Sequence, residues 1–275
     1  MHPGKNTFGK FIERMRLDRL RHIHSPSGSF CSTRLPIAMC PVKQRSGRMS
    51  ENQPPPAINP MPPVVMALFL IIAAVELGFM LGGFGLFGGQ SGSALRSQAI
   101  ESYGVNTMLA GWMIENQSYP LEHLARFVSY SFIHASTLHA AVACALFLAM
   151  GKMVGSVFSA VSVLLVFGLS AAIGAFALCL VLPDGGWLFG AYPGIYGLIG
   201  AYTFLMWITL KAQNGRPSQA FSLIAMLLAI QLVFGIVFGD NYHWVAELVG
   251  FLTGFSLSFF LVPGGFRRVL EFWRR

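Results

Sequence analysis

Long apolar runs, separated by short polar connections, occupy most of this chain after residue 61. Six stretches are apolar over about 18 residues or more, which is long enough to cross a bilayer as a helix. They lie at about 62–81, 125–150, 154–182, 190–210, 219–238 and 244–262. The pattern predicts an all-α, polytopic membrane protein built as a bundle of six transmembrane helices. The longer, glycine-rich and moderately polar segment 82–124 is predicted to be a loop.

The overall composition agrees with this pattern. Hydrophobic residues make up 54% of the chain and charged residues 11%, whereas soluble domains carry about 25% charged residues. The net charge of +8 comes from residues 1–48, where ten basic residues face two acidic ones. Because the membrane part is neutral overall, the basic character does not indicate a nucleic-acid partner.

The chain divides into four segments by composition. We expect residues 1–48 to form a basic, disordered extension, or to be untranslated if the protein starts at Met49. A helix on an anionic leaflet, through the apolar positions of 8–15, is the alternative. A proline-rich linker (49–61), the membrane domain (62–263) and a basic tail (264–275) follow.

The basic residues of the short loops predict the orientation in the membrane. Lys152, Lys211, Arg216 and the arginines of the tail all fall on one side of a six-helix topology. Short loops rich in Lys and Arg stay in the cytoplasm. Both termini are therefore predicted to be cytoplasmic.

Glycines recur three and four residues apart in two of the apolar stretches. Residues at that spacing share one face of a helix, and glycines there allow a second backbone to approach closely. We expect the first set to pack against the second, as a helix-packing site. The first set is Gly190, Gly194 and Gly197, and the second is Gly250 and Gly254.

The sequences at 190–198 and 246–254 resemble the rhomboid family of intramembrane serine proteases. The family pattern reads Gly-x-Ser-Gly-x-Ile-x-Gly-Leu at the first site and Ala-His-x-x-Gly-x-x-x-Gly at the second. The matching residues are Gly190, Ile195, Gly197 and Leu198 in the first pattern and Ala246, Gly250 and Gly254 in the second. The nucleophile position is Tyr192, the glycine after it is replaced by Pro193, and the base position is Glu247. The resemblance implies the rhomboid fold without an intact catalytic dyad.

The resemblance extends to 132–139, which matches a Phe-Leu-His-x-x-x-x-His run in the family. It places His139 at one of two oxyanion-side positions, and the second, an asparagine in active members, is Ala143. A serine becomes nucleophilic only beside a base that takes its proton. Loss of one oxyanion donor alone costs about 10²–10³ in rate.

Two acidic residues within the apolar stretches need partners. For Glu247 the candidate partners are Tyr192, His139 and His243. Glu76 is expected either to pair with another residue or to snorkel, extending its carboxyl toward the membrane surface. A metal site formed by His139, His243 and Glu247 has suitable ligand types but no supporting spacing motif. We therefore expect no metal and no cofactor.

These observations predict a rhomboid-like protein in the bacterial inner membrane that binds transmembrane client proteins without cleaving them. The bilayer and these clients are the expected partners. The alternative is an active intramembrane endopeptidase with atypical catalytic residues. A third hypothesis is a transporter-like protein that has adopted the fold.

Overall fold

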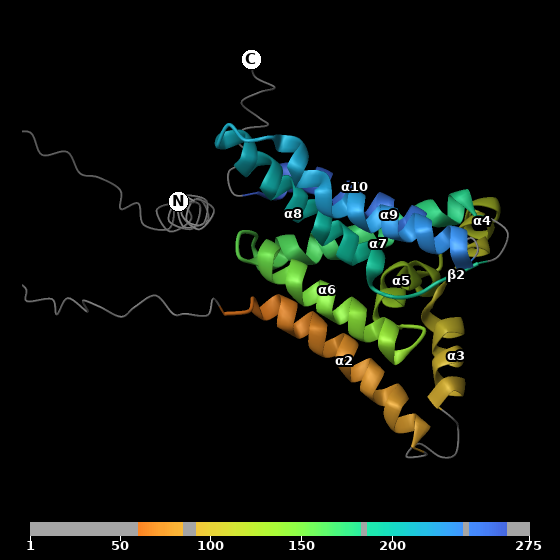
Figure 1. The fold of residues 1–275 in the computed structure, drawn as a ribbon. Helices are drawn as coiled ribbons and strands as arrows, with labels where there is room; N and C mark the ends of the chain where they lie inside the picture. Colours follow the sequence, from red (N-terminus) through yellow and green to blue (C-terminus); the bar gives the residue numbers. More distant parts are fainter. Residues whose placement is uncertain (1–59, 85–91, 183–185, 239–241, 263–275) are drawn as a thin grey trace, which may run out of the picture.

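A computed structural model describes residues 60–84, 92–182, 186–238 and 242–262 (Figure 1). The predicted basic extension, nearly all of the proline-rich linker and the basic tail lie outside these residues. The helices and strands below refer to the described part of the chain.

Five helices in these ranges are long and apolar enough to cross a membrane. They are α2 (Pro63–Gly83), α6 (Thr137–Gly155), α7 (Ala160–Val181), α8 (Tyr192–Ala212) and α10 (His243–Leu261). The remaining predicted stretch, at about 219–238, corresponds to η2 (Pro217–Phe221) followed by α9 (Ser222–Phe238), an apolar helix of 17 residues. The fold class predicted from the sequence, an all-α polytopic membrane bundle, is confirmed.

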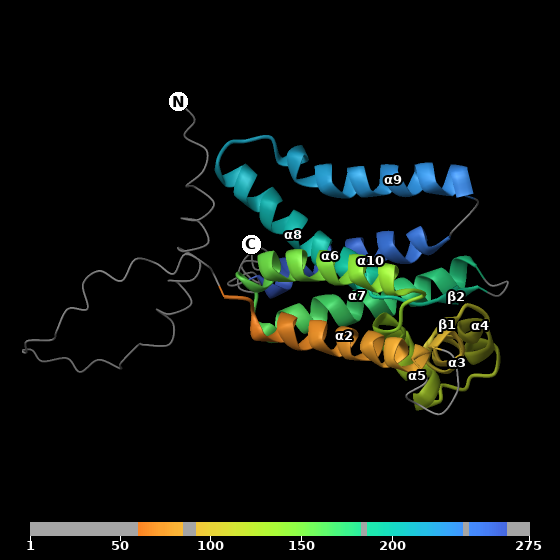
Figure 2. The ribbon, with the colours of Figure 1, turned by 60° about the horizontal axis from the view of Figure 1, so that its bottom comes forward.

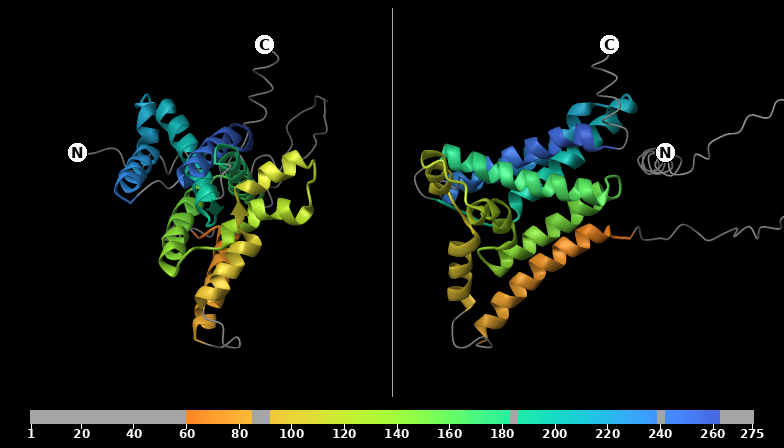
Figure 3. Two further views of the ribbon diagram at one scale, coloured as in Figure 1. Left: turned by 90° about the vertical axis from the view of Figure 1, so that its right-hand side faces the viewer. Right: turned by 180° about the vertical axis from the view of Figure 1, so that it is seen from behind.

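The helices alternate in direction through the bundle. Figure 2 shows that α2 begins and α10 ends on the same side of the molecule. The segment between α2 and α6 is called loop 1 below, and its described residues are 84 and 92–136. They gather at the opposite end, as the right-hand view of Figure 3 also shows. This arrangement places both ends of the described bundle on the same side of the molecule.

Loop 1 is more regular than the sequence predicted. It contains α3 (Gly92–Tyr103), β1 (Val105–Asn106), α4 (Met108–Glu115), α5 (Leu121–Ser129) and η1 (Tyr130–Phe132). Strand β1 pairs antiparallel with β2 (Trp187–Leu188), which precedes α8. The sequence gives little sign of this pairing, because it joins two very short strands that are far apart along the chain.

The second transmembrane helix begins later than the apolar pattern predicted. The predicted span started at about residue 125, whereas α6 starts at Thr137. Ser136 ends the preceding loop and caps the helix, since its hydroxyl accepts a hydrogen bond from the His139 N–H at 3.2 Å. The residues before it belong to the separate amphipathic helix α5, which buries Phe127.

Helix α8 is the most buried of the five spans and lies at the centre of the bundle. Its closest neighbour is α10, and small residues permit the approach. A Cβ atom at Gly254 would overlap the backbone of Gly197, and one at Gly250 would overlap the carbonyl of Pro193. In a membrane, such contacts hold helices together by close packing, because lipid is as apolar as the side chains.

All three glycines of the first predicted set have Cβ positions that face other neighbours than α10. A Cβ atom at Gly197 would overlap the Ser170 side chain of α7. Gly194 lies against the ring and backbone of Phe167 on α7. Gly190 precedes α8 and lies beside the rings of His134 and His139. The α8 glycines therefore contact α7 and α10 on different sides, because a buried central helix has neighbours on more than one face.

Candidate functional site

The beginnings of α6, α8 and α10 meet on the loop 1 side of the bundle, and each contributes one predicted site residue. His139 lies in the first turn of α6, Tyr192 begins α8 and Glu247 follows in the second turn of α10. The oxyanion-side position Ala143 lies one turn after His139 and is fully buried.

Gly190 makes the sharp turn that leads into α8. Its φ of 98° lies in the left-handed region, which glycine adopts without strain. Its N–H donates a hydrogen bond to the Tyr130 carbonyl at 3.0 Å, and the Tyr130 hydroxyl donates to the Ala171 carbonyl at 2.9 Å. Loop 1 and α7 thereby fix the position from which α8 starts.

Tyr192, predicted to occupy the nucleophile position, packs directly on His139. The two rings are stacked with centroids 4.8 Å apart and an interplanar angle of 16°. The Tyr192 hydroxyl donates a long hydrogen bond, 3.4 Å, to the backbone carbonyl of His139. A backbone carbonyl cannot take up the proton of a nucleophile, so this contact positions the phenol without activating it.

The backbone amide that precedes Tyr192 also forms a hydrogen bond. The Ala191 N–H donates to Nε2 of His134 at 3.3 Å. Burial lowers the pKa of His134 to about 4, so the ring is neutral near pH 7 and Nε2 can accept. Sequence reasoning had not assigned this role to His134. An amide bonded in this way is not free to receive an oxyanion.

Glu247, predicted to occupy the base position, is buried with 7% of its surface exposed. Its carboxyl hydrogen-bonds with the side chain of Tyr196, one turn further along α8 than the expected partner Tyr192. Glu247 is near enough to Tyr192 to interact electrostatically. The structure thus places the carboxyl deeper in the bundle than the predicted pairing implied.

The third candidate partner, His243, lies at the rim of the site. Its Nε2 is 3.0 Å from the Trp187 carbonyl of β2. The ring of Phe189 contacts the edges of both His139 and His243, at centroid distances of 6.3 and 5.8 Å. Within the ranges that the structure describes, no three or more His, Cys, Asp or Glu side chains are grouped to hold a metal ion.

Glu76 of α2 anchors a second polar network near the site. The Arg96 guanidinium of α3 binds both carboxylate oxygens, at 2.7 and 3.0 Å, and Thr137 donates to the same carboxylate at 2.7 Å. Arg96 also donates to the His134 carbonyl at 2.6 Å. The network joins the first span, loop 1 and the start of α6, and it holds the residue that accepts from Ala191.

The role of Arg96 could not be read from the sequence. It lies in a segment without clear periodicity, 20 residues from its partner. The only signal was the expectation that an acid inside an apolar span has a partner. That expectation left open which residue the partner would be.

Comparison with known proteins identifies one family. A family model described as the Rhomboid domain matches residues 121–264, slightly more than half of the chain. The match runs from α5 to just beyond α10 and includes His139, Ala143, Tyr192 and Glu247, whereas Glu76 and Arg96 lie before it. No curated protein matches the chain.

Proposed function

Because the chain belongs to the rhomboid family, we propose that it binds transmembrane client proteins without cleaving them. The packing of Tyr192 on His139 is the observation that carries this proposal. Peptide hydrolysis by a serine-type mechanism needs a hydroxyl nucleophile, a base beside it and preorganised oxyanion donors. Each of these three requirements is compromised in this chain.

The nucleophile requirement fails on both chemistry and geometry. A phenol replaces the serine hydroxyl, and its ring occupies the space in front of His139. Its oxygen is directed to a backbone carbonyl, which accepts a hydrogen bond but not a proton. Tyr192 therefore acts as a packing residue that fills the site.

The oxyanion requirement fails at two positions. Ala143 offers no side-chain donor where active members carry an asparagine. The Ala191 N–H, next to the nucleophile position, is bonded to His134. Since one missing donor costs about 10²–10³ in rate, both losses together support a protein without peptidase turnover.

The alternative, a peptidase that uses Tyr192 or Glu247, requires one of them to act as nucleophile or base. Glu247 is the acid that the resemblance assigns to the site, and it is hydrogen-bonded with Tyr196, a side chain that is itself only 3% exposed. A base in that position is directed into the bundle, away from the space where a peptide bond would approach.

The chain retains the packed helix bundle of the family. The close contact of Gly254 with Gly197 preserves the central helix pair although the catalytic residue types are gone. A membrane bundle that retains its packing and loses its chemistry can still engage helices of other membrane proteins through its apolar surfaces. This is why we favour client binding over the transporter-like hypothesis.

We place the protein in the bacterial inner membrane with both termini in the cytoplasm. The basic loops after α6 and α8, together with the basic tail, support this orientation. The loop 1 end of the bundle, which carries the site, then faces the opposite side of the membrane. A client would be recognised where its helix emerges on that side.

A binding measurement in liposomes tests the proposal. We would label the reconstituted protein and a single-span rhomboid substrate, and measure energy transfer between the two fluorophores. The matched control is the same span with its helix-breaking glycines and prolines replaced by leucine. We expect saturable transfer with the substrate and weaker transfer with the control. Equal transfer from both spans at all protein densities would contradict client recognition.

A further inference from the structure

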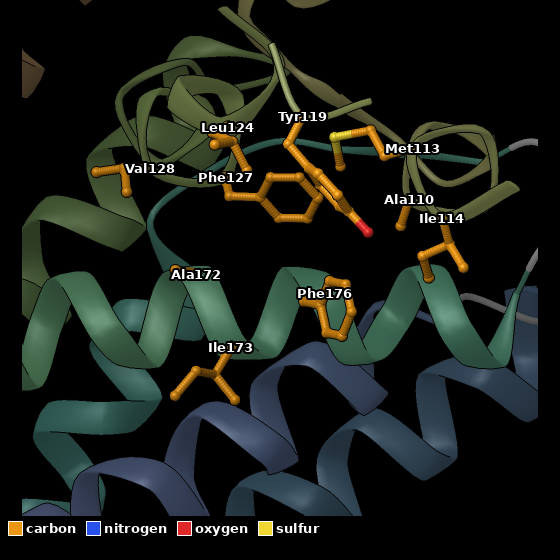
Figure 4. Close-up of a pocket in the computed structure, with 10 residues that line it drawn as sticks. All are labelled: Ala110, Met113, Ile114, Tyr119, Leu124, Phe127, Val128, Ala172, Ile173 and Phe176. Carbon is orange, nitrogen blue, oxygen red and sulfur yellow. The ribbon is translucent and has the colours of Figure 1, made fainter. Parts of the chain in front are cut away.

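A hollow separates loop 1 from the outer face of α7 (Figure 4). Its volume is about 370 Å³, and its walls come from α4, α5, the connection between them and α7. The base is formed by Ala110, Met113 and Phe127, which are at most 6% exposed. The hollow lies on the far side of α7 from α8 and is separate from the site around Tyr192.

Small residues create the space, and its walls are apolar. Ala110 on α4 and Ala172 on α7 stand where larger side chains would fill the gap. The hydroxyl of Tyr119 is the only side-chain oxygen or nitrogen among the lining residues, and Figure 4 shows its ring reaching over Phe176. A site with so few polar groups selects an apolar occupant.

The hollow opens onto the surface that faces lipid. Among its lining residues, Ile173 and Phe176 are 44% and 42% exposed. Along the same helix, Leu169 and Leu180 are also exposed. Because α7 is a transmembrane helix, an exposed apolar face on it contacts the acyl chains of the bilayer. The hollow is a recess in that lipid-facing surface.

The position of the mouth favours a lipid tail over a client helix as the occupant. The mouth opens beside Ile173 and Phe176 on the exposed face of a transmembrane helix, where acyl chains of the bilayer are always present. An acyl chain is a flexible single file of methylene groups, and its end can pass from the bilayer into the recess.

We propose that this recess binds one acyl chain of a bilayer phospholipid and thereby seals loop 1 against α7. The tail replaces the contacts that larger residues at positions 110 and 172 would otherwise supply. It contacts the exposed side chains at the mouth and the buried base. This inference does not depend on whether the protein binds clients or cleaves them.

Photo-crosslinking tests the proposal on the full-length protein in nanodiscs. The probe is a phosphatidylcholine with a diazirine in one tail, and crosslinked peptides are quantified by mass spectrometry. We expect strong labelling of α4 and α5 beside the recess. Ala172→Phe should reduce that labelling at least about tenfold. The larger side chain excludes about two methylene groups of the tail from the recess, and losing their burial lowers the affinity by about that factor. Ala177→Phe, half-buried on the same helix but outside the recess, is the matched control and should leave it unchanged.

A second variant covers the case in which Ala172→Phe does not fold. Ile173→Ala widens the mouth and should keep or increase the labelling of α4 and α5. The proposal is overturned if Ala172→Phe folds and labels like the wild type, or if Ile173→Ala abolishes labelling. It is also overturned if a transmembrane client peptide displaces the lipid probe, because a client side chain would then be the occupant.

Discussion

Replacing Gly254 by alanine adds one methyl group at the tightest contact between α10 and α8. The new Cβ would overlap the carbonyl and Cα of Gly197. The obstacle is backbone and cannot rotate away, so the two helices must separate. Gly78 on α2 offers a matched control, because an added Cβ there has no heavy atom within 4 Å.

The expected size of the effect follows from two opposing terms. Glycine to alanine in a helix contributes up to about 1 kcal/mol of stability through helix propensity, and this applies to both variants. Overpacking a well-filled interior costs about 1–3 kcal/mol, and this applies only at Gly254. Gly254→Ala should therefore be less stable than Gly78→Ala by about 1–3 kcal/mol. At about 2–4 °C per kcal/mol, the melting temperatures should differ by several degrees.

Thermal unfolding in one detergent, followed by circular dichroism, compares the wild type with the two variants. Gly250→Ala should behave like Gly254→Ala, since its Cβ would overlap the carbonyl of Pro193. If Gly254→Ala melts at or above Gly78→Ala, the two helices do not pack through their backbones, and the assignment of this contact is wrong.

Three further predictions concern the buried polar groups. Glu247→Gln should leave the free energy of unfolding unchanged, because the amide can still hydrogen-bond with Tyr196. Glu247→Leu should lower it by about 1–3 kcal/mol, because the Tyr196 hydroxyl loses its partner. Chemical denaturation compares the two variants. Arg96→Met should cost about 3–5 kcal/mol by leaving the Glu76 carboxylate buried without its cation, and adding Glu76→Leu should recover part of the loss in a double-mutant cycle. The lowered pKa of His134 predicts that stability is full above about pH 6.5 and falls progressively toward about pH 4; His134→Gln should flatten this part of the pH–stability curve.

The transmembrane helices could be predicted because length and apolarity alone determine a span. The close approach of α10 to α8 through Gly250 and Gly254 could be predicted, because glycine spacing marks a helix face. The glycine face of α8 was assigned to the wrong neighbour, since Gly194 and Gly197 direct their Cβ positions to α7. The partner of Glu247 could not be predicted from the sequence. Whether Tyr192 or Tyr196 meets the carboxyl depends on how far α8 is shifted along α10, and the contact of Gly250 with Pro193 helps to set that offset.

The helices and strand of loop 1 could not be predicted from the sequence. Its helix α3 is balanced between apolar and polar residues, so no period distinguishes it from a loop. Its position comes from interactions with distant parts of the chain. These are the ion pair of Arg96 with Glu76 and the pairing of Val105 with Leu188.

The central claim, that this rhomboid does not cleave, is tested most directly by a proteolysis assay. The wild type is reconstituted with a transmembrane substrate of rhomboid peptidases, and cleavage products are followed by electrophoresis. We expect none from the wild type. The combined change Tyr192→Ser, Glu247→His, Pro193→Gly and Ala143→Asn is the smallest set expected to restore turnover, because it supplies nucleophile, base and donor together. Cleavage by the wild type that disappears in Tyr192→Phe or Glu247→Ala would contradict the account and make that residue catalytic.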